Sequence, residues 1–75
     1  MEIDITLDVK KKSCPVPVLL TRQKLEEMES GQILQVIVDL SVSIENIRRF
    51  AVEHGHEILR IDDKRTQYEV FIKKK

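Results

Sequence analysis

The chain has 75 residues, with 13 basic and 13 acidic side chains and a formal net charge of zero, which argues against a dedicated nucleic-acid-binding protein. A chain of this length buries only about 60% of the surface that it exposes when unfolded, so we expect one domain over residues 1–75 and no deep catalytic cleft. It has one cysteine, no apolar run near the roughly 18–20 residues of a membrane span, and an acidic start unlike a signal peptide, so we expect a reduced cytoplasmic protein without a membrane partner.

The first half of the chain predicts a strand, a helix and a second strand. Residues 2–8 alternate between polar and apolar side chains, which is the period of a strand with one buried face. Its apolar members are Ile3, Ile5 and Leu7. Proline is tolerated in the first turn of a helix, so we predict a helix from Pro15 to about Ser30 that stops at Gly31. Residues 32–39 predict a second strand, whose core face is Leu34, Val36 and Val38.

The second half predicts a helix followed by two strands. Ser41 or Ser43 can cap the helix, and Gly55 is expected to end it. The apolar stripe of this helix is Ile44, Ile47, Phe50, Ala51 and His54. Residues 56–61 and 67–72 predict two strands joined by a polar turn. The resulting order, β-α-β-α-β-β, predicts an α+β fold: a two-layer sandwich with a four-stranded mixed sheet and both helices on one face.

Cys14 is the candidate functional residue. A free cysteine is often a small buried hydrophobe, and that interpretation needs no function. However, Cys14 directly precedes a predicted helix, where unpaired N–H groups and the positive end of the helix dipole favour a thiolate. The pKa of the thiol is therefore expected to fall and its nucleophilicity to rise. Pro15 and Pro17 fix φ and would hold the segment in place.

A basic cluster, Lys10, Lys11 and Lys12, precedes the cysteine. Cations at a helix N-terminus oppose the helix dipole, by roughly 0.3–1 kcal/mol each at exposed sites. An anion beside them, such as a thiolate or persulfide, would explain their placement; a solvated loop is the alternative.

The residues that are missing limit the chemistry. Without a second cysteine, the chain cannot perform an internal dithiol exchange. No histidine lies near Cys14 in sequence to act as a general base, and His54 and His56 lack further ligands for a metal. A lone activated thiol suits a carrier of a chemical group better than a stand-alone enzyme, and we expect neither a metal nor a cofactor.

Val16 and Leu20 are candidates for a docking surface. At about 100° per residue they fall nearly opposite the helix face centred on Val18, Leu25 and Met28. Either the buried stripe is wide, or these two side chains form an exposed apolar spot beside the thiol where a partner docks.

Several segments together resemble one known family. The run Cys14-Pro15-Val16-Pro17-Val18-Leu19 has the Cys-Pro-x-Pro motif followed by apolar residues. Gly31-Gln32-Ile33-Leu34, Gly55-His56-Glu57-Ile58 and Tyr68-Glu69-Val70-Phe71-Ile72-Lys73 follow in matching order. In this register over nearly the whole chain, the sequence resembles the TusA/SirA-like family of sulfur-carrier proteins.

The resemblance implies a function and a strand arrangement. Cys14 would take a sulfane sulfur from a donor protein such as a cysteine desulfurase, hold it as a persulfide and pass it to an acceptor protein. Family members serve tRNA thiolation and other sulfur-transfer pathways. The last strand would be central and antiparallel in the sheet.

The chain departs from the family pattern at two places. Lys11 stands where members usually have glycine, so the loop is expected to bend less freely or differently. Asp39-Leu40-Ser41 stands where the family often has Asp-Asp-Pro.

Two other functions are weighed against the carrier. One is a non-catalytic RNA- or protein-binding module with a structural Cys14, which the balanced charge and scarce aromatic residues disfavour. The other is a self-sufficient thiol enzyme, which lacks an evident base.

Overall fold

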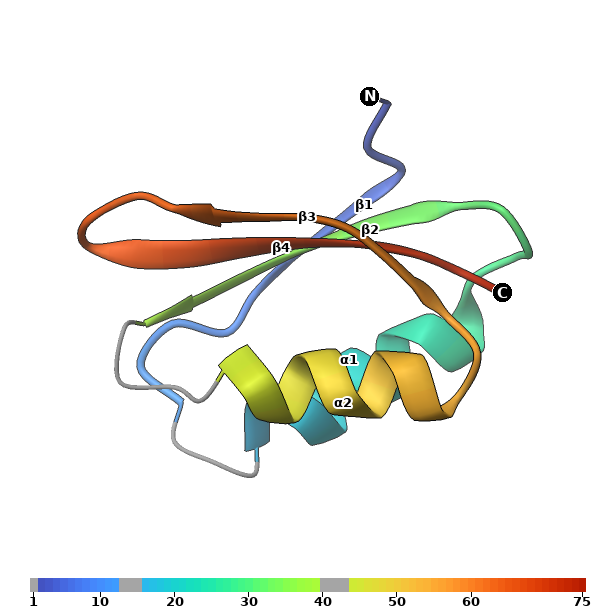
Figure 1. Ribbon diagram of the computed structural model, residues 1–75, viewed down its shortest axis with the longest axis horizontal. Helices are drawn as coiled ribbons and strands as arrows, with labels where there is room; N and C mark the ends of the chain where they lie inside the picture. Colours follow the sequence, from blue (N-terminus) through green and yellow to red (C-terminus); the bar gives the residue numbers. More distant parts are fainter. Residues whose placement is uncertain (1, 13–15, 40–43) are drawn as a thin grey trace.

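A computed structural model describes residues 2–12, 16–39 and 44–75 (Figure 1). Within these ranges the elements follow the predicted order, β-α-β-α-β-β. They are β1 (Ile5–Asp8), α1 (Val16–Glu27), β2 (Ile33–Asp39), α2 (Ile44–Glu53), β3 (Glu57–Asp63) and β4 (Gln67–Lys73).

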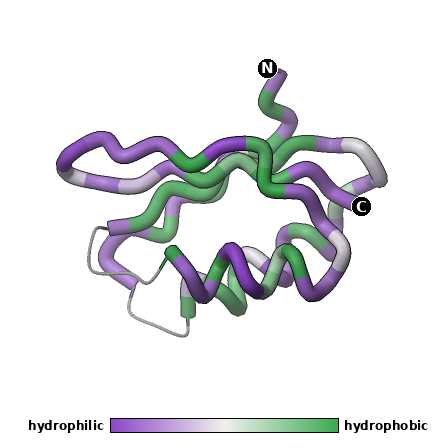
Figure 2. The backbone as a smooth tube through the Cα atoms, viewed as in Figure 1, coloured by the Kyte–Doolittle hydropathy of each residue, from purple (hydrophilic) through white to green (hydrophobic). Residues whose placement is uncertain are grey.

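The strands form one mixed sheet in the order β1-β2-β4-β3. β1 pairs with β2 in parallel, and β4 pairs antiparallel with both β2 and β3. β4 is therefore a central antiparallel strand, as the family resemblance implied. Both helices pack on the same face of the sheet (Figure 1), which confirms the two-layer α+β sandwich. In Figure 2 α2 alternates between hydrophobic and hydrophilic residues, as expected of a helix with one buried face.

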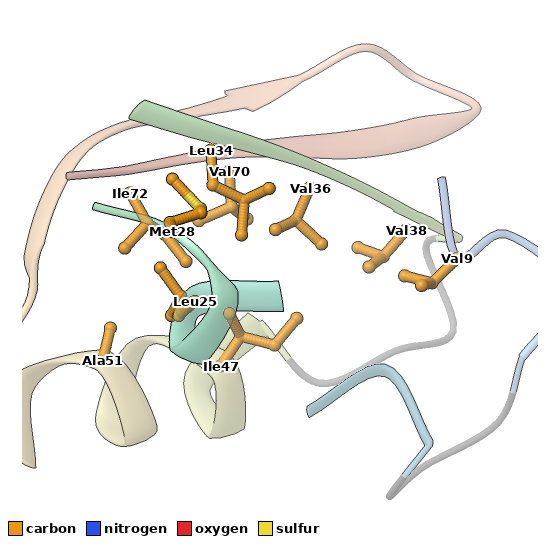
Figure 3. Close-up of a cluster of buried hydrophobic side chains, with 10 residues drawn as sticks. All are labelled: Val9, Leu25, Met28, Leu34, Val36, Val38, Ile47, Ala51, Val70 and Ile72. Atoms are coloured by element: carbon orange, nitrogen blue, oxygen red, sulfur yellow. The ribbon is translucent and has the colours of Figure 1, made fainter. Parts of the chain in front are cut away.

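The core lies between the sheet and the helices. The predicted core face of β2 is fully buried and forms a row along the strand (Figure 3). Leu25 of α1 and Ile47 of α2 pack against it from the helix layer. Val9, one residue past β1, continues the alternation of that strand into the core and is only 1% exposed. The sequence analysis did not single out Val9.

The helix ends differ in how well the sequence predicted them. α1 ends at Glu27 rather than near Ser30, because the chain turns earlier. The side chain of Gln32 accepts the N–H of Glu29 at 2.9 Å, and the N–H of Gln32 donates to the carbonyl of Glu29 at 3.1 Å, which closes a separate turn. At α2 the prediction of a glycine cap is confirmed: Gly55 has φ of 81°.

Two other boundary predictions were wrong. β1 begins at Ile5 rather than at residue 2, and the Asp4 carboxylate instead accepts the N–H of Ile33 at 2.8 Å. His54, placed in the apolar stripe of α2, lies past the helix end and is exposed. Its ring stacks on Phe50 with centroids 4.3 Å apart.

A tight hairpin joins β3 to β4. β3 continues to Asp63, beyond the predicted end at residue 61, so the loop is only Lys64, Arg65 and Thr66. Arg65 has φ of 71°, the left-handed conformation that such three-residue loops require and that glycine usually supplies. A side chain in this conformation costs roughly 1–2 kcal/mol.

The described part of the chain contains no helix that is both long and apolar enough to cross a membrane.

His56, directly before β3, should make stability depend on pH. Partial burial, and then the positive charges of Lys74, His54 and Lys75, lower the pKa of His56 from its usual 6.5. Its Nδ1 also accepts the N–H of Lys75 at 3.1 Å, a bond that protonation at Nδ1 would break.

We therefore predict that the free energy of unfolding decreases as the pH is lowered through the pKa of His56. The pKa of His56 is lower in the folded protein than in the unfolded chain, so the unfolded chain takes up the proton first as the pH falls. The stability that neutral His56 contributes is therefore present above pH 6.5 and is lost as the pH falls through the folded pKa. Urea unfolding of the wild type and of His56→Gln at pH 7.5 and pH 5.5 measures this. The variant should lose less stability at the lower pH; equal losses would contradict the assignment.

Candidate functional site

Strand ends and helix starts gather at one end of the molecule (Figure 1). β1, β2 and β3 run in the same direction, so their carboxyl ends lie together. α1 and α2 follow β1 and β2 and begin at this same end, where their positive dipole ends are directed. We call it the site end. Ligands of open α/β sheets typically bind at such an edge.

Cys14 and Pro15 lie outside the described residues, so the structure does not place the thiol. Lys12 and Val16 precede and follow this segment in the chain, and both belong to the site end. Lys12 and Val16, the described residues on either side of the segment 13–15, therefore lie at the end where the two helices begin.

The backbone of residues 9–12, which lead into this segment, is fixed by hydrogen bonds. Val9 donates its N–H to the carbonyl of Ile37 in β2 at 2.9 Å. Lys10 donates its N–H to the Asp8 carboxylate at 3.0 Å, and Lys12 donates to the carbonyl of Val9 at 3.3 Å. The loop is thus tied to both β1 and β2.

Lys11 makes the most informative of these contacts. Its φ is 69°, in the left-handed region, and its N–H donates to the carboxylate of Asp39. Asp39 is the last residue of β2 and is half-buried. An ionised acceptor makes a hydrogen bond stronger than a neutral one, so Asp39 helps to hold Lys11 in a conformation that most side chains avoid.

The three lysines of the predicted basic rim are exposed. The Nζ of Lys10 is 4.0 Å from the Asp8 carboxylate, an exposed pair that contributes little to stability. The lysines are therefore accessible to a partner, and their role in binding stays a prediction.

The predicted apolar spot is placed only in part as expected. Val16 is 37% exposed, but Leu20 is half-buried and packs against the core, so the prediction that Leu20 is exposed was wrong. Leu19 is instead the exposed leucine of α1, at 49%. An exposed apolar surface beside the cysteine segment consists of Val16 and Leu19.

Thr21 explains the error. It is fully buried, and its hydroxyl donates to the carbonyl of Pro17 at 2.7 Å, one turn earlier in the helix. A buried hydroxyl needs such a partner, and this one is supplied locally. Pro17, Thr21 and Leu25 therefore form the buried face, which brings Leu20 against the core.

Comparisons with known proteins agree with the fold and with the family. The family model "Sulfurtransferase TusA" matches residues 5–74. The chain belongs to the TusA family. A relative from Methanocaldococcus jannaschii is 40% identical over 68 residues, which are 91% of each chain. The sulfur carrier protein TusA of Allochromatium vinosum is 32% identical over 73 residues, which cover 97% of this chain and 96% of that one.

A solved structure is also similar. The crystal structure of a SirA-like protein from Desulfitobacterium hafniense superposes with a TM-score of 0.81 at 30% sequence identity, covering 93% of this chain and 96% of the other. The family resemblance read from the sequence is confirmed.

At Lys11, where the sequence departs from the family pattern, the backbone has a positive φ. Lys11 takes the left-handed conformation in which a glycine is unstrained, so the loop bends as a glycine would allow. The other departure, Leu40-Ser41, lies outside the described residues.

Sequence reasoning missed three features of this end. They are the buried Val9, the buried Thr21 and the bond from Lys11 to Asp39. The alternation continuing past Asp8 could have identified Val9. Nothing local signals a contact between residues 28 positions apart.

We predict that Lys11→Gly stabilises the protein. Glycine removes roughly 1–2 kcal/mol of conformational strain from the folded state. Its greater freedom also stabilises the unfolded chain by about 0.4–1 kcal/mol, which offsets part of this gain. The free energy of unfolding should therefore rise by about 0.5–1 kcal/mol. Urea denaturation measures the difference.

The matched control is Lys10→Gly, which removes the same charge from the same loop at a residue without a positive φ. It should leave stability unchanged or lower it. Equal effects of the two variants would show that charge, and not backbone strain, is responsible.

Proposed function

We propose that this protein is a sulfur carrier in which Cys14 accepts a sulfane sulfur, holds it as a persulfide and passes it to an acceptor protein. The observation that carries the proposal is the Cys-Pro-x-Pro motif of a TusA-family chain, whose sole cysteine lies between Lys12 and Val16 in sequence. Both flanking residues belong to the end where two helices begin.

The transfer is balanced without an external oxidant or reductant. The Cys14 thiolate attacks the terminal sulfur of a persulfide on the donor. A sulfur–sulfur bond forms at Cys14 while the donor's own sulfur–sulfur bond breaks, and the electron pair leaves with the donor sulfur as a thiolate. The hydrogen of the transferred sulfur stays with it. In the onward step an acceptor nucleophile attacks the terminal sulfur, and Cys14 leaves as a thiolate.

Both steps favour a stabilised thiolate at Cys14. A thiol of lower pKa is a better leaving group and is more fully ionised at neutral pH. Helix N-termini and nearby lysines stabilise such an anion, and the site end provides both. Pro15 and Pro17 support the motif by restricting the backbone on either side of Val16.

A carrier needs a sulfur donor and a sulfur acceptor. We propose a cysteine desulfurase as the donor, and tRNA thiolation or another sulfur-transfer route as the pathway. We place the reaction in the cytoplasm, where a lone thiol is kept reduced.

The open face of the sheet gives little support to the alternative of an RNA-binding module. Such sheets stack bases on exposed aromatic side chains. Phe71, which alternates with the core-facing Val70 and Ile72 and so lies on this face, is only 9% exposed, between Gln35 and Arg60 in the strand register. Gln35 and Glu69 of the neighbouring strands are hydrogen-bonded to each other at 3.0 Å.

Cys14→Ser should abolish sulfur acceptance and leave the fold intact, because serine cannot hold a sulfane sulfur but is a good helix N-cap. The test is incubation with a cysteine desulfurase and cysteine, followed by intact-mass measurement. The wild type should gain the mass of a sulfur atom, which a thiol reductant then removes. A folded Cys14→Ser protein that gains the same mass would end the carrier proposal.

The exposed pair Val16 and Leu19 is our proposed apolar docking surface, together with the basic rim of Lys10, Lys11 and Lys12 and with the half-buried Leu20 at its margin. Leu19→Ser should shorten the lifetime of the complex with the donor and change stability by less than about 0.5 kcal/mol.

Leu20→Ser is the matched comparison. It should cost about 1–2 kcal/mol of stability, less than the 2–5 kcal/mol of a fully buried leucine. Surface-based binding kinetics and urea denaturation of both variants test this assignment. If the complex of Leu19→Ser with the donor has the same lifetime as the wild-type complex, Leu19 is not part of the docking surface.

A further inference from the structure

The β3–β4 hairpin loop lies at the same end of the molecule as the lysines before Cys14 (Figure 1). Gln67, the first residue of β4, pairs with Asp39 at the end of β2. Lys64 donates its N–H to the carbonyl of Gln67 at 2.9 Å, and Asp39 accepts the N–H of Lys11. Two backbone contacts and one hydrogen bond to the Asp39 side chain thus connect the two basic loops.

Each of these loops contains one strained residue, and both strained residues are basic. Lys11 and Arg65 are the two non-glycine residues with positive φ in the described part of the chain, at 69° and 71°. Only 13 of the 75 residues are Lys or Arg. Glycine would adopt either conformation without strain. Strain of this kind is typically retained at functional positions, so the cationic side chains are the feature that needs an explanation.

The carboxylates of the hairpin contact donors of the hairpin itself, and the Arg65 side chain is exposed. The Asp63 carboxylate accepts the N–H of Arg65 at 3.0 Å. The Asp62 carboxylate is hydrogen-bonded to Arg60, and its second oxygen is 4.0 Å from the Nζ of Lys64. Among the described residues, no acidic group forms an ion pair with the Arg65 side chain. In Figure 2 the tip of the hairpin is hydrophilic.

We propose that Arg65 and Lys64 are a second cationic element of the docking surface, which binds acidic side chains of the protein that donates sulfur to Cys14. The inference rests on the proposed carrier function and extends its partner surface from the lysine loop to the hairpin. A guanidinium group can bind a carboxylate through two parallel hydrogen bonds, and the fixed loop backbone sets its position. Together with Lys11, the hairpin presents cations on both sides of the Asp39–Gln67 pair.

The test is Arg65→Gly, in which stability and function should change in opposite directions. Because glycine relieves the strained φ, the Tm should stay the same or rise by a few degrees. The rate of sulfur loading from a cysteine desulfurase with cysteine, at low ionic strength, should fall by about threefold to tenfold, and its dependence on salt should weaken. A slower reaction in a protein of undiminished stability cannot result from unfolding.

Two variants serve as controls. Arg65→Lys keeps the charge and should retain most of the loading rate. Lys73→Gln removes a positive charge from the opposite end of β4, where Lys73 pairs with Ile33, and should load as fast as the wild type. If Lys73→Gln slows loading as much as Arg65→Gly does, net charge is responsible and the hairpin proposal is overturned.

Alkylation by iodoacetamide, a small neutral reagent, separates the two proposals. Arg65→Gly should react at the wild-type rate, because the thiol itself is unchanged. If the wild type is alkylated but never loaded by the desulfurase, the desulfurase-loaded carrier proposal falls, and this inference falls with it. If the wild type is loaded and Arg65→Gly is loaded equally fast, the carrier remains and the hairpin assignment is wrong. Unchanged loading with slower onward transfer to an acceptor protein would likewise overturn the assignment to the donor.

Discussion

Parallel pairing of β1 with β2 is the constraint on which the site depends. Two neighbouring parallel strands require a crossover connection, and here that connection is α1. β3 runs parallel to β2 as well, with β4 inserted between them, so α2 is a second crossover of the same kind. Both helices therefore begin where β1 and β2 end. The positive ends of two helices meet at one edge of a small sheet as a direct consequence.

Residues 9–12 are ordered by contacts from this sheet and not by their own sequence. Val9 fills the edge of the core, and Asp39 accepts the N–H of the strained Lys11. Residues 9–12 thus have a fixed conformation at an exposed edge of the fold. For a carrier this arrangement is suitable, since the thiol of such a protein must reach the sites of other proteins.

Much of the fold could be predicted from local patterns. The period of two in β1 and β2 and the helical stripe of Ile47 and Ala51 identified the elements and their buried faces. The boundaries were less predictable where a side chain replaced a backbone hydrogen bond, as Asp4 does at Ile33 and Gln32 does at Glu29. Those contacts depend on geometry that periodicity does not contain.

The sequence by itself determined the element order, the core of β2 and the family. These follow from residue types at fixed spacing, which the chain carries whatever its tertiary contacts. Only the tertiary structure decided that Leu20 packs inward and Leu19 outward, because the buried face of α1 includes Thr21, whose hydroxyl is satisfied within the helix. It also decided that Lys11 adopts the conformation of a glycine, because the carboxylate that holds it comes from a strand 28 residues away.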